Sequence, residues 1–404
     1  MELTSEERAI LAGERGEAQR RALEYQIEVG RFWGAKRFVP VTSVHMMGDI
    51  EVMGDGGLAW LKDEADRGAR CQVATTTNAR CIDFAHCDRL GQDAGEVAKE
   101  RELIATLRRM DVVTTDTCIN YQTVYQPHLG EHVAWGDTGT VIYANSVFGA
   151  RSNFESGPAA LAAALTGRTP EYGFHLDEKR KGTFAVELKA ELNDLADWGA
   201  VGKLVGESHQ DYFAVPVFHG FHRAPTADEL KHLGAALASY GSMGMFHFVG
   251  VTPEAPSRLP SEKMAIGEKE IQSVYAGYRL GDGNGRLVVF SGPQQSLLEM
   301  KRLAELFRGR KVQGSCFVTT NSAVLAQSRD LGYAQAIEQA GVSILQGVCF
   351  YILQNLSPMR EKNGWTNMVS NSAKIVNIIG AHRFNTILRR TADCVEIACS
   401  GKLK

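Results

Sequence analysis

Short apolar strands alternate with amphipathic helices along most of this 404-residue chain. The strands expected from this pattern are 71–76, 111–115, 212–218, 245–251, 287–290, 316–320 and 342–347. Helices are predicted between them over 95–109, 227–239, 294–308 and 323–339. Continuous apolar strands followed by helices are typical of parallel sheets covered by helices. The chain is therefore predicted to be an α/β protein.

Helix boundaries and loops add detail to this prediction. Thr4 with Glu7, and Thr226 with Glu229, have the spacing of capping boxes and predict helix starts. The segments 253–260 (PEAPSRLP) and 281–286 (GDGNGR) are rich in Pro or Gly. These two loops are the predicted breaks between subdomains.

Composition excludes several classes of function. The formal charge of −3, with 23% charged residues, gives no reason to expect nucleic acid as a partner. No apolar run approaches the roughly 18 residues that a membrane span needs. The N-terminus MELTSEERAI is polar and acidic, so it is not a signal peptide. We expect a cytoplasmic protein.

The eight cysteines do not form a recognisable local motif. They contain no C-x-x-C pair, so a zinc ribbon or a thioredoxin-type site is unsupported. A reducing cytosol makes a disulfide framework unexpected. Most of these cysteines are predicted to be small buried hydrophobic residues.

Small polar residues and two cysteines directly follow the predicted strands. Cys118 comes soon after strand 111–115, Thr320 ends strand 316–320, and Cys349 follows strand 342–347. Ligands of parallel α/β sheets gather beyond the carboxyl ends of the strands. The pattern predicts a shared cleft, although such residues also serve simply as helix caps.

A second candidate site precedes the alanine-rich segment 158–167. Pro158 suits the first turn of a helix, Ser156 its cap, and Gly167 its end. The free N–H groups of a helix start attract anions, and Arg151 just upstream could hold a carboxylate. The neutral donors that could assist are Asn145, Ser146, Ser152 and Asn153. The alternative is that Arg151 makes an ordinary surface salt bridge.

Three further motifs do not predict a site by themselves. HLGEH (128–132) matches a zinc pattern, but Pro127 and Gly130 oppose the helix that this pattern needs. GDGNGR lacks the strand and helix of a dinucleotide fingerprint and is predicted to be a turn. The spacing of His175 gives it no role.

Longer stretches resemble the aconitase X family, a divergent branch of the aconitase superfamily. The matching stretches are LTSEE, LAGERG, DTCINYQ, the block from GEHVAWGDTG to PEYGFH within 131–175, NSAKI and DCVEIACSG. The resemblance extends over nearly the whole chain, 1–404. It implies an aconitase-like lobe of several subdomains, with mostly parallel sheets flanked by helices.

The resemblance also implies an iron–sulfur hydro-lyase. The ligand set carried over from the family is Cys118, Cys349 and Cys394, and the cluster could be 2Fe-2S, 3Fe-4S or 4Fe-4S. Such a cluster has thiolate ligands and acts as a Lewis acid on the leaving hydroxyl. The chain departs from the family at Gly347-Val348-Cys349, where relatives tend to have Asp-Thr-Cys.

In the family, a small swivelling domain closes the site and supplies a serine as catalytic base. We expect this domain to be absent here and to come from a separate small subunit. His45 and Lys374 occupy family motif positions and are further candidate substrate contacts. With them, the candidate substrate-binding residues are Asn145, Ser146, Arg151, Ser152, Asn153, His175 and Thr320.

Two substrates agree with the resemblance, and both are small hydroxy acids. The favoured one is cis-3-hydroxy-L-proline, and the alternative is mevalonate 5-phosphate, whose phosphate needs clustered cations such as Lys179, Arg180 and Lys181. A second alternative is a non-catalytic iron–sulfur or small-molecule-binding protein.

Overall fold

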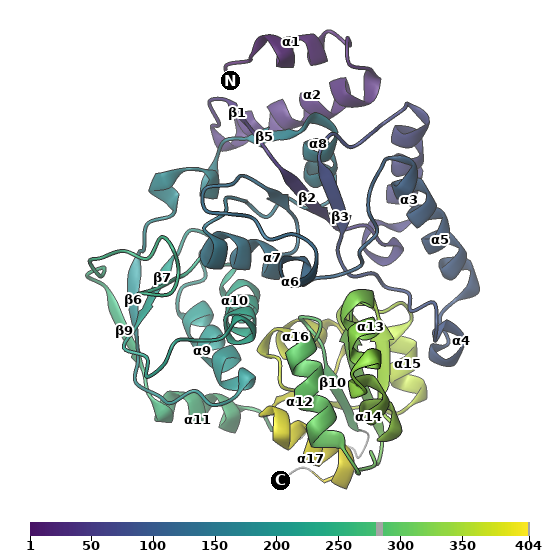
Figure 1. The fold of residues 1–404 in the computed structure, drawn as a ribbon, viewed down its shortest axis with the longest axis vertical. Helices are drawn as coiled ribbons and strands as arrows, with labels where there is room; N and C mark the ends of the chain where they lie inside the picture. Colours follow the sequence, from purple (N-terminus) through teal and green to yellow (C-terminus); the bar gives the residue numbers. More distant parts are fainter. Residues whose placement is uncertain (280–285, 403–404) are drawn as a thin grey trace.

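A computed structural model describes residues 1–279 and 286–402, and its sheets are mostly parallel, as predicted. Figure 1 shows three units in different colours: purple to blue at the top, teal at lower left, and green to yellow at lower right. Each unit contains one parallel sheet with helices packed against it. The predicted α/β architecture is therefore confirmed.

The first unit has the three-stranded parallel sheet β3-β2-β4 and the antiparallel pair β1-β5. Its strands are β1 (Phe38–Pro40), β2 (Ser43–Met46), β3 (Ala74–Thr77), β4 (Ala134–Trp135) and β5 (Arg168–Pro170). Its helices are α1 (Ser5–Leu11), α2 (Glu17–Trp33), α3 (Ile50–Asp66), α4 (Cys87–Leu90), α5 (Ala94–Arg109), α6 (Asn120–Thr123), α7 (Thr138–Tyr143) and α8 (Pro158–Thr166). A π-helix over Ala144–Phe148 continues α7.

The second unit has the four-stranded parallel sheet β8-β7-β6-β9. Its elements are β6 (Phe184–Leu188), α9 (Leu195–Ser208), β7 (Pro216–His219), α10 (Ala227–Gly241), β8 (His247–Phe248), β9 (Lys263–Ile266) and α11 (Glu268–Gly277). The segment 253–260 lies between β8 and β9, and β9 pairs with β6 in this same sheet. The subdomain break predicted near 253–260 is therefore wrong, because that loop lies inside one unit.

The third unit has the five-stranded parallel sheet β12-β11-β10-β13-β14. Its strands are β10 (Arg286–Phe290), β11 (Ser315–Thr320), β12 (Ser343–Gln346), β13 (Asn367–Ser370) and β14 (Asn385–Leu388). Its helices are α12 (Leu297–Phe307), α13 (Ser322–Asp330), α14 (Tyr333–Gln339), α15 (Leu356–Lys362), α16 (Ala373–Ile378) and α17 (Thr391–Ser400). The other predicted break, 281–286, lies outside the described residues except for Arg286, which begins β10.

Three local predictions were wrong. Segment 111–115 forms only one bridge, Thr76 with Val113, instead of a strand. The helix predicted over 323–339 is divided at Gly332, whose left-handed backbone (φ 76°) starts α14 as a separate helix. The cap of α8 is Gly157 rather than Ser156, while Pro158 does occupy the first turn.

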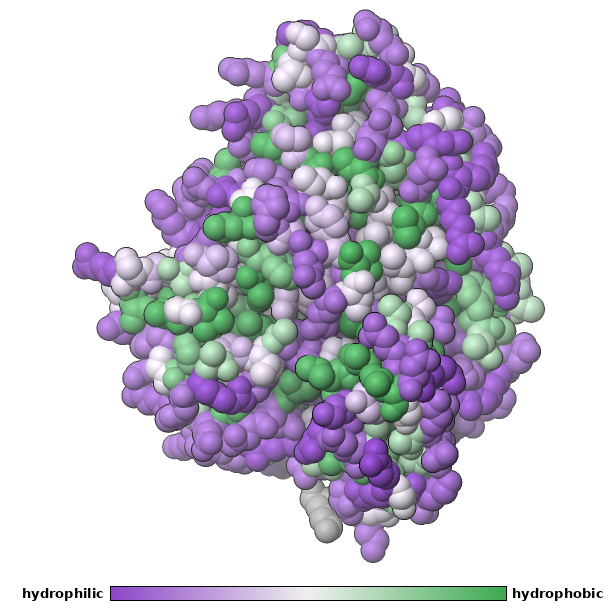
Figure 2. All heavy atoms as spheres, viewed as in Figure 1, coloured by the Kyte–Doolittle hydropathy of each residue, from purple (hydrophilic) through white to green (hydrophobic). Residues whose placement is uncertain are grey.

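The core is continuous from the second unit into the third, because α16 packs on both α9 and α10. The approach is close: a Cβ added at Gly199 of α9 would lie 2.9 Å from Cβ of Ala373 in α16. In Figure 2 hydrophilic residues dominate the rim, and apolar residues gather toward the middle of this face. No helix in the described ranges is long and apolar enough to cross a membrane.

Candidate active site

Loops at the carboxyl ends of the first and third parallel sheets meet at one place. The loop after β3 and the loop after β12 are joined by two main-chain hydrogen bonds, from Arg80 N to Gly347 O (2.9 Å) and from Cys349 N to Arg80 O (3.1 Å). Gly347 has φ 71°, and a Cβ there would lie 3.2 Å from Cβ of Asp116. These contacts bring the segments that carry Cys118 and Cys349 together, although 111–115, before Cys118, is not the strand from which this position was predicted.

Both thiols are in their neutral form at this site. Cys118 is 8% exposed, and its Sγ accepts a hydrogen bond from the main-chain N–H of Gln294 (3.2 Å). Burial raises the pKa of Cys118 to about 12, with further contributions from Asp137 and Cys349. Burial also raises the pKa of Cys349, although the charge of Lys374 opposes that shift. A thiol with a raised pKa must lose its proton before it can bind a metal.

Lys374 gives the site a buried positive charge. Its side chain is 14% exposed, and Nζ lies 3.4 Å from both Asp137 Oδ2 and Thr138 Oγ1. Burial alone would lower the pKa of Lys374, but the nearby carboxylate of Asp137 is the largest of the causes that oppose burial, and the pKa is raised. The ammonium therefore stays protonated beside Cys118 and Cys349.

Asp137 was not predicted from the sequence, although it had a local signal. It is separated from the end of β4 by one residue and caps α7, where its Oδ2 accepts a hydrogen bond from Gly139 N (3.2 Å). An aspartate between an apolar strand and a helix start has this capping role as its usual explanation. Only the fold reveals that the same carboxylate pairs with Lys374.

His45 lies at the same site, in the middle strand of the first sheet. Its ring is fully buried, and Nδ1 lies 2.8 Å from Thr76 Oγ1. Burial lowers the pKa of His45 to about 4, against the opposing charge of Asp137. The ring is therefore neutral at physiological pH.

Cys394 is not brought to the other two predicted ligands. It lies in α17 and is fully buried, with its Sγ 3.4 Å from the main-chain oxygen of Arg389. Burial raises its pKa well above the usual value, and Asp194 and Asp393 add to that rise. In residues 1–279 and 286–402 no group of three or more His, Cys, Asp or Glu is arranged to hold a metal ion.

A cluster held by Cys118, Cys349 and Cys394 therefore does not fit the residues that the site offers. Iron–sulfur clusters are held by several thiolates. This site brings together two thiols, Cys118 and Cys349, with the Lys374 ammonium beside them. Of the ligand set implied by the resemblance, Cys118 and Cys349 lie together at this site.

The polar residues predicted around segment 145–153 stabilise the fold with their side chains. Asn145 donates to Ser152 O (2.8 Å) and Gly244 O (2.9 Å), and Ser146 Oγ accepts from Phe246 N (2.9 Å). Ser152 Oγ accepts from the main-chain N–H of Trp135 in β4 (3.0 Å). Asn153 donates to Tyr172 O (3.0 Å) and accepts from Phe174 N (3.0 Å). These four buried side chains hold loops together instead of presenting free donors.

Thr320 has a similar structural role. It is fully buried, and its hydroxyl donates to Gln295 O (2.7 Å). This bond joins the end of β11 to the loop after β10, which also contains Gln294.

Arg151 and His175 form a separate cluster. Arg151 pairs with Asp177 (2.5 Å) and donates to the main-chain oxygen of His175 (2.8 Å). His175, a predicted substrate contact, is buried, with its ring nitrogens 2.8 Å from His132 Nδ1 and 3.1 Å from Glu155 Oε1. The contacts of Arg151 fit the alternative of an ordinary salt bridge better than a guanidinium that is free to bind a substrate carboxylate. The segment 128–132 is a turn, without the helix that a zinc pattern needs.

Comparisons with known proteins agree with this fold. Family models described as the aconitase X first, second and third domains match residues 1–178, 182–276 and 285–400. The chain belongs to the aconitase X family. A crystal structure of Thermococcus kodakaraensis aconitase X (holo-form) superposes with a TM-score of 0.87 and 32% identity, over 98% of this chain and 100% of that chain.

Relatives with named activities are dehydratases. The phosphomevalonate dehydratase large subunit of Thermococcus kodakarensis is 35% identical, over 93% of this chain and 94% of its own length. That of Methanocaldococcus jannaschii is 34% identical over the same shares. Cis-3-hydroxy-L-proline dehydratase of Pseudomonas aeruginosa is 30% identical, over 98% of this chain and 70% of its own length. By this membership the aconitase X chain is a hydro-lyase, an enzyme that removes water from its substrate.

Proposed function

We propose that this chain is the large subunit of a dehydratase for a small hydroxy acid, with cis-3-hydroxy-L-proline as the substrate. The observation that carries the proposal is the buried group of Cys118, Cys349, Lys374, Asp137 and His45 at the carboxyl ends of two sheets. In this arrangement the Lys374 ammonium binds the substrate carboxylate. Neutral His45 offers a hydrogen-bonding ring without adding a second positive charge.

In this proposal Lys374, and not Arg151 as predicted, binds the substrate carboxylate. Arg151 is already paired with Asp177, whereas the contacts of Lys374 are long, at 3.4 Å. A substrate carboxylate can replace such long contacts with shorter ones, because charge-assisted N–H···O bonds prefer about 2.7–2.9 Å.

The charge balance supports the imino acid over a phosphorylated substrate. The site offers one cation with long contacts, Lys374, because Arg80 is already paired closely with Asp116. A phosphate needs more than one cation that is not already neutralised. The predicted phosphate cluster is also unsupported, because Arg180 is buried against Glu254 and Lys179 lies over the ring of Phe213.

Mevalonate 5-phosphate remains the second candidate for one specific reason. Its dehydratase large subunits are the relatives with 34–35% identity, and they match this chain over nearly their whole length. Their name also supports a small partner subunit for this chain. In the proposal that partner supplies the catalytic base, and an iron–sulfur cluster, if bound, would require ligands in addition to Cys118 and Cys349.

The test is an anaerobic preparation of this chain with its small subunit, assayed separately on each substrate. We expect water loss from cis-3-hydroxy-L-proline with formation of the pyrroline product, and a large loss of turnover in Cys118→Ser. Turnover of mevalonate 5-phosphate alone would transfer the proposal to the second substrate. A preparation that dehydrates neither, with iron and sulfide analysis showing no cluster, would favour a non-catalytic binding protein instead.

A further inference from the structure

Gln294 lies between the two loops that carry Cys118 and Cys349. Its main-chain N–H donates to Cys118 Sγ (3.2 Å). Its side-chain amide donates to Asp116 O (3.2 Å) in the first loop and to Val348 O (3.3 Å) in the second. One residue from the loop after β10 therefore contacts both cysteine loops.

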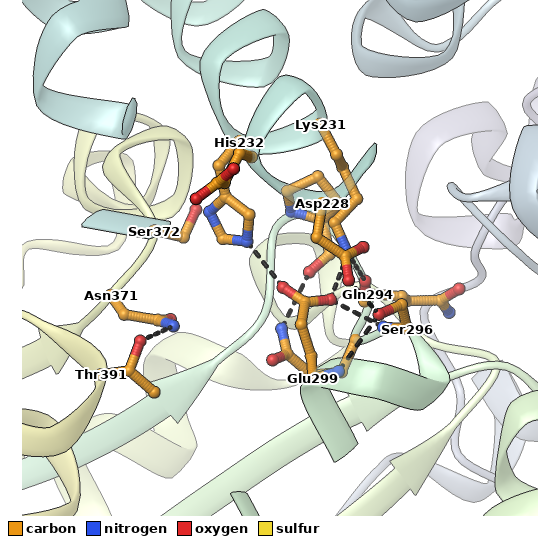
Figure 3. A network of polar contacts seen from close by, with 12 residues as sticks. Asp228, Lys231, His232, Gln294, Ser296, Glu299, Asn371, Ser372 and Thr391 are labelled. Carbon is orange, nitrogen blue, oxygen red and sulfur yellow. Dashed lines mark hydrogen bonds and ion pairs between the residues drawn. The ribbon is translucent and has the colours of Figure 1, made fainter. Parts of the chain in front are cut away.

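The backbone of Gln294 is in turn held by a buried lysine of the second unit. Lys231, in α10, is 1% exposed, and its Nζ lies 3.3 Å from Gln294 O. The same ammonium pairs with Asp228 (3.2 Å) and with Glu299 of α12. Figure 3 shows Lys231 and Asp228 on one helix facing Gln294, Ser296 and Glu299 on the opposite segment.

The network around Lys231 is closed by further hydrogen bonds. Glu299 accepts from His232 Nε2 (2.8 Å) and from the main-chain N–H of Ser296 (2.7 Å). Asp228 accepts from Ser296 Oγ (2.7 Å) and from Gln122 Nε2 (2.9 Å). Buried charges with this many partners have a fixed geometry, so the loop containing Gln294 starts from a rigid base.

We propose that Gln294 is a positioning residue that fixes the two cysteine loops relative to each other, and that Lys231 anchors it from the second unit. All three units meet in this chain of contacts: Cys118 belongs to the first, Lys231 to the second, and Cys349 to the third. The inference rests on the proposed function only in treating the two thiols as part of the active site. Its test needs neither substrate nor turnover.

The neighbouring residue Gln295 provides a matched control. Gln294 and Gln295 are equally buried, at 1% exposure. The Gln295 side chain, however, donates only to Pro293 O (3.4 Å) within its own loop. A change of glutamine to methionine removes the same amide at both positions and keeps a similar volume, so only the contacts between loops differ.

The experiment is alkylation of the full chain with iodoacetamide, with the rate at each cysteine followed by mass spectrometry. In Gln294→Met we expect Cys118 and Cys349 to react roughly tenfold faster, because local opening that costs ~1.4 kcal/mol less is tenfold more populated. Buried Cys81, Cys316 and Cys394 should keep their rates. Gln295→Met should resemble the unaltered chain.

Two results would overturn the proposal. One is a Gln294→Met protein in which Cys118 and Cys349 react at unaltered rates. The other is equal acceleration at all buried cysteines, or the same effect from Gln295→Met, since either means general loosening. If Gln294→Met does not fold, Gln294→Glu keeps the shape, removes the amide donor and turns a carboxylate toward Asp116 O and Val348 O, and the same two readings apply. A failed dehydratase assay leaves this result unchanged, so the two proposals can fail separately.

Discussion

Two buried lysines of this protein have contrasting surroundings. Lys231 is enclosed by two carboxylates and a main-chain oxygen, and both carboxylates have additional donors. Lys374 has one carboxylate, at 3.4 Å, and lies beside two neutral thiols. The pKa of each lysine is raised because burial, which lowers it, is outweighed by nearby carboxylates. Removal of a charge that already has all its partners leaves those partners buried and uncompensated, whereas a charge with few and long contacts can still bind a ligand.

The largest expected effect is on stability, from Lys231→Met. This change leaves Asp228 and Glu299 buried without their cation, and loss of one partner of a buried ion pair costs about 3–5 kcal/mol. Urea unfolding followed by fluorescence should show a lower midpoint, and the free energy of unfolding derived from the curve should fall by that amount. A midpoint unchanged from the original chain would remove the distinction between the two lysines.

Lys374→Met should have the opposite balance of effects, with a large loss of turnover and a small loss of stability. We expect turnover with the small subunit to fall roughly 10²- to 10³-fold, the typical cost of removing one preorganised charged or polar donor from an active site. The unfolding midpoint should fall less than in Lys231→Met, because Asp137 keeps its hydrogen bond from the start of α7. Both variants should be measured by urea unfolding and by the turnover assay, so that each variant serves as the control for the other. Full activity in Lys374→Met would contradict the assigned substrate contact.

The smallest of the three expected effects is a loss of stability in acid, caused by protonation of Asp228 beside Lys231. Burial would raise the pKa of Asp228, but Lys231, Gln122 and Ser296 outweigh it and lower the pKa to about 2. A lowered pKa contributes stability that is present above the unfolded value of about 3.9 and is lost as the pH falls toward 2. The expected loss is about 2 kcal/mol, and Asp228→Asn should flatten this part of the stability curve. Equal curves for both proteins would show that Asp228 titrates normally in the fold.

Much of the fold could be predicted from local patterns. The capping boxes at Thr4 and Thr226 are present, and helices 95–109 and 227–239 occur within a few residues of their predicted bounds. The strand predicted over 111–115 was wrong, because residues with a high β propensity do not by themselves provide a partner strand. The break at 253–260 was wrong because a Pro-rich loop can equally join two strands of one sheet.

The site was harder to predict, because a short polar residue has the same sequence signature whether it holds a loop or binds a ligand. Asn145 and Asn153 use their side chains on main-chain groups more than ten residues away, which no local pattern reveals. Cys394 follows a family motif, yet the packing of α17 keeps its thiol in the core near Cys316. Gln294 could not be found at all, since its partners come from two distant loops.

The hydrogen bonds between Arg80 and the 347–349 loop have a consequence for the order in which this enzyme matures. The first unit leaves the ribosome with Cys118 long before Cys349 and Lys374 are synthesised. Until they arrive, the first sheet has an open carboxyl edge and an unpartnered thiol. The proposed site is therefore among the last parts that the growing chain can assemble, and the docking of its first and third units brings Cys118, Cys349 and Lys374 together.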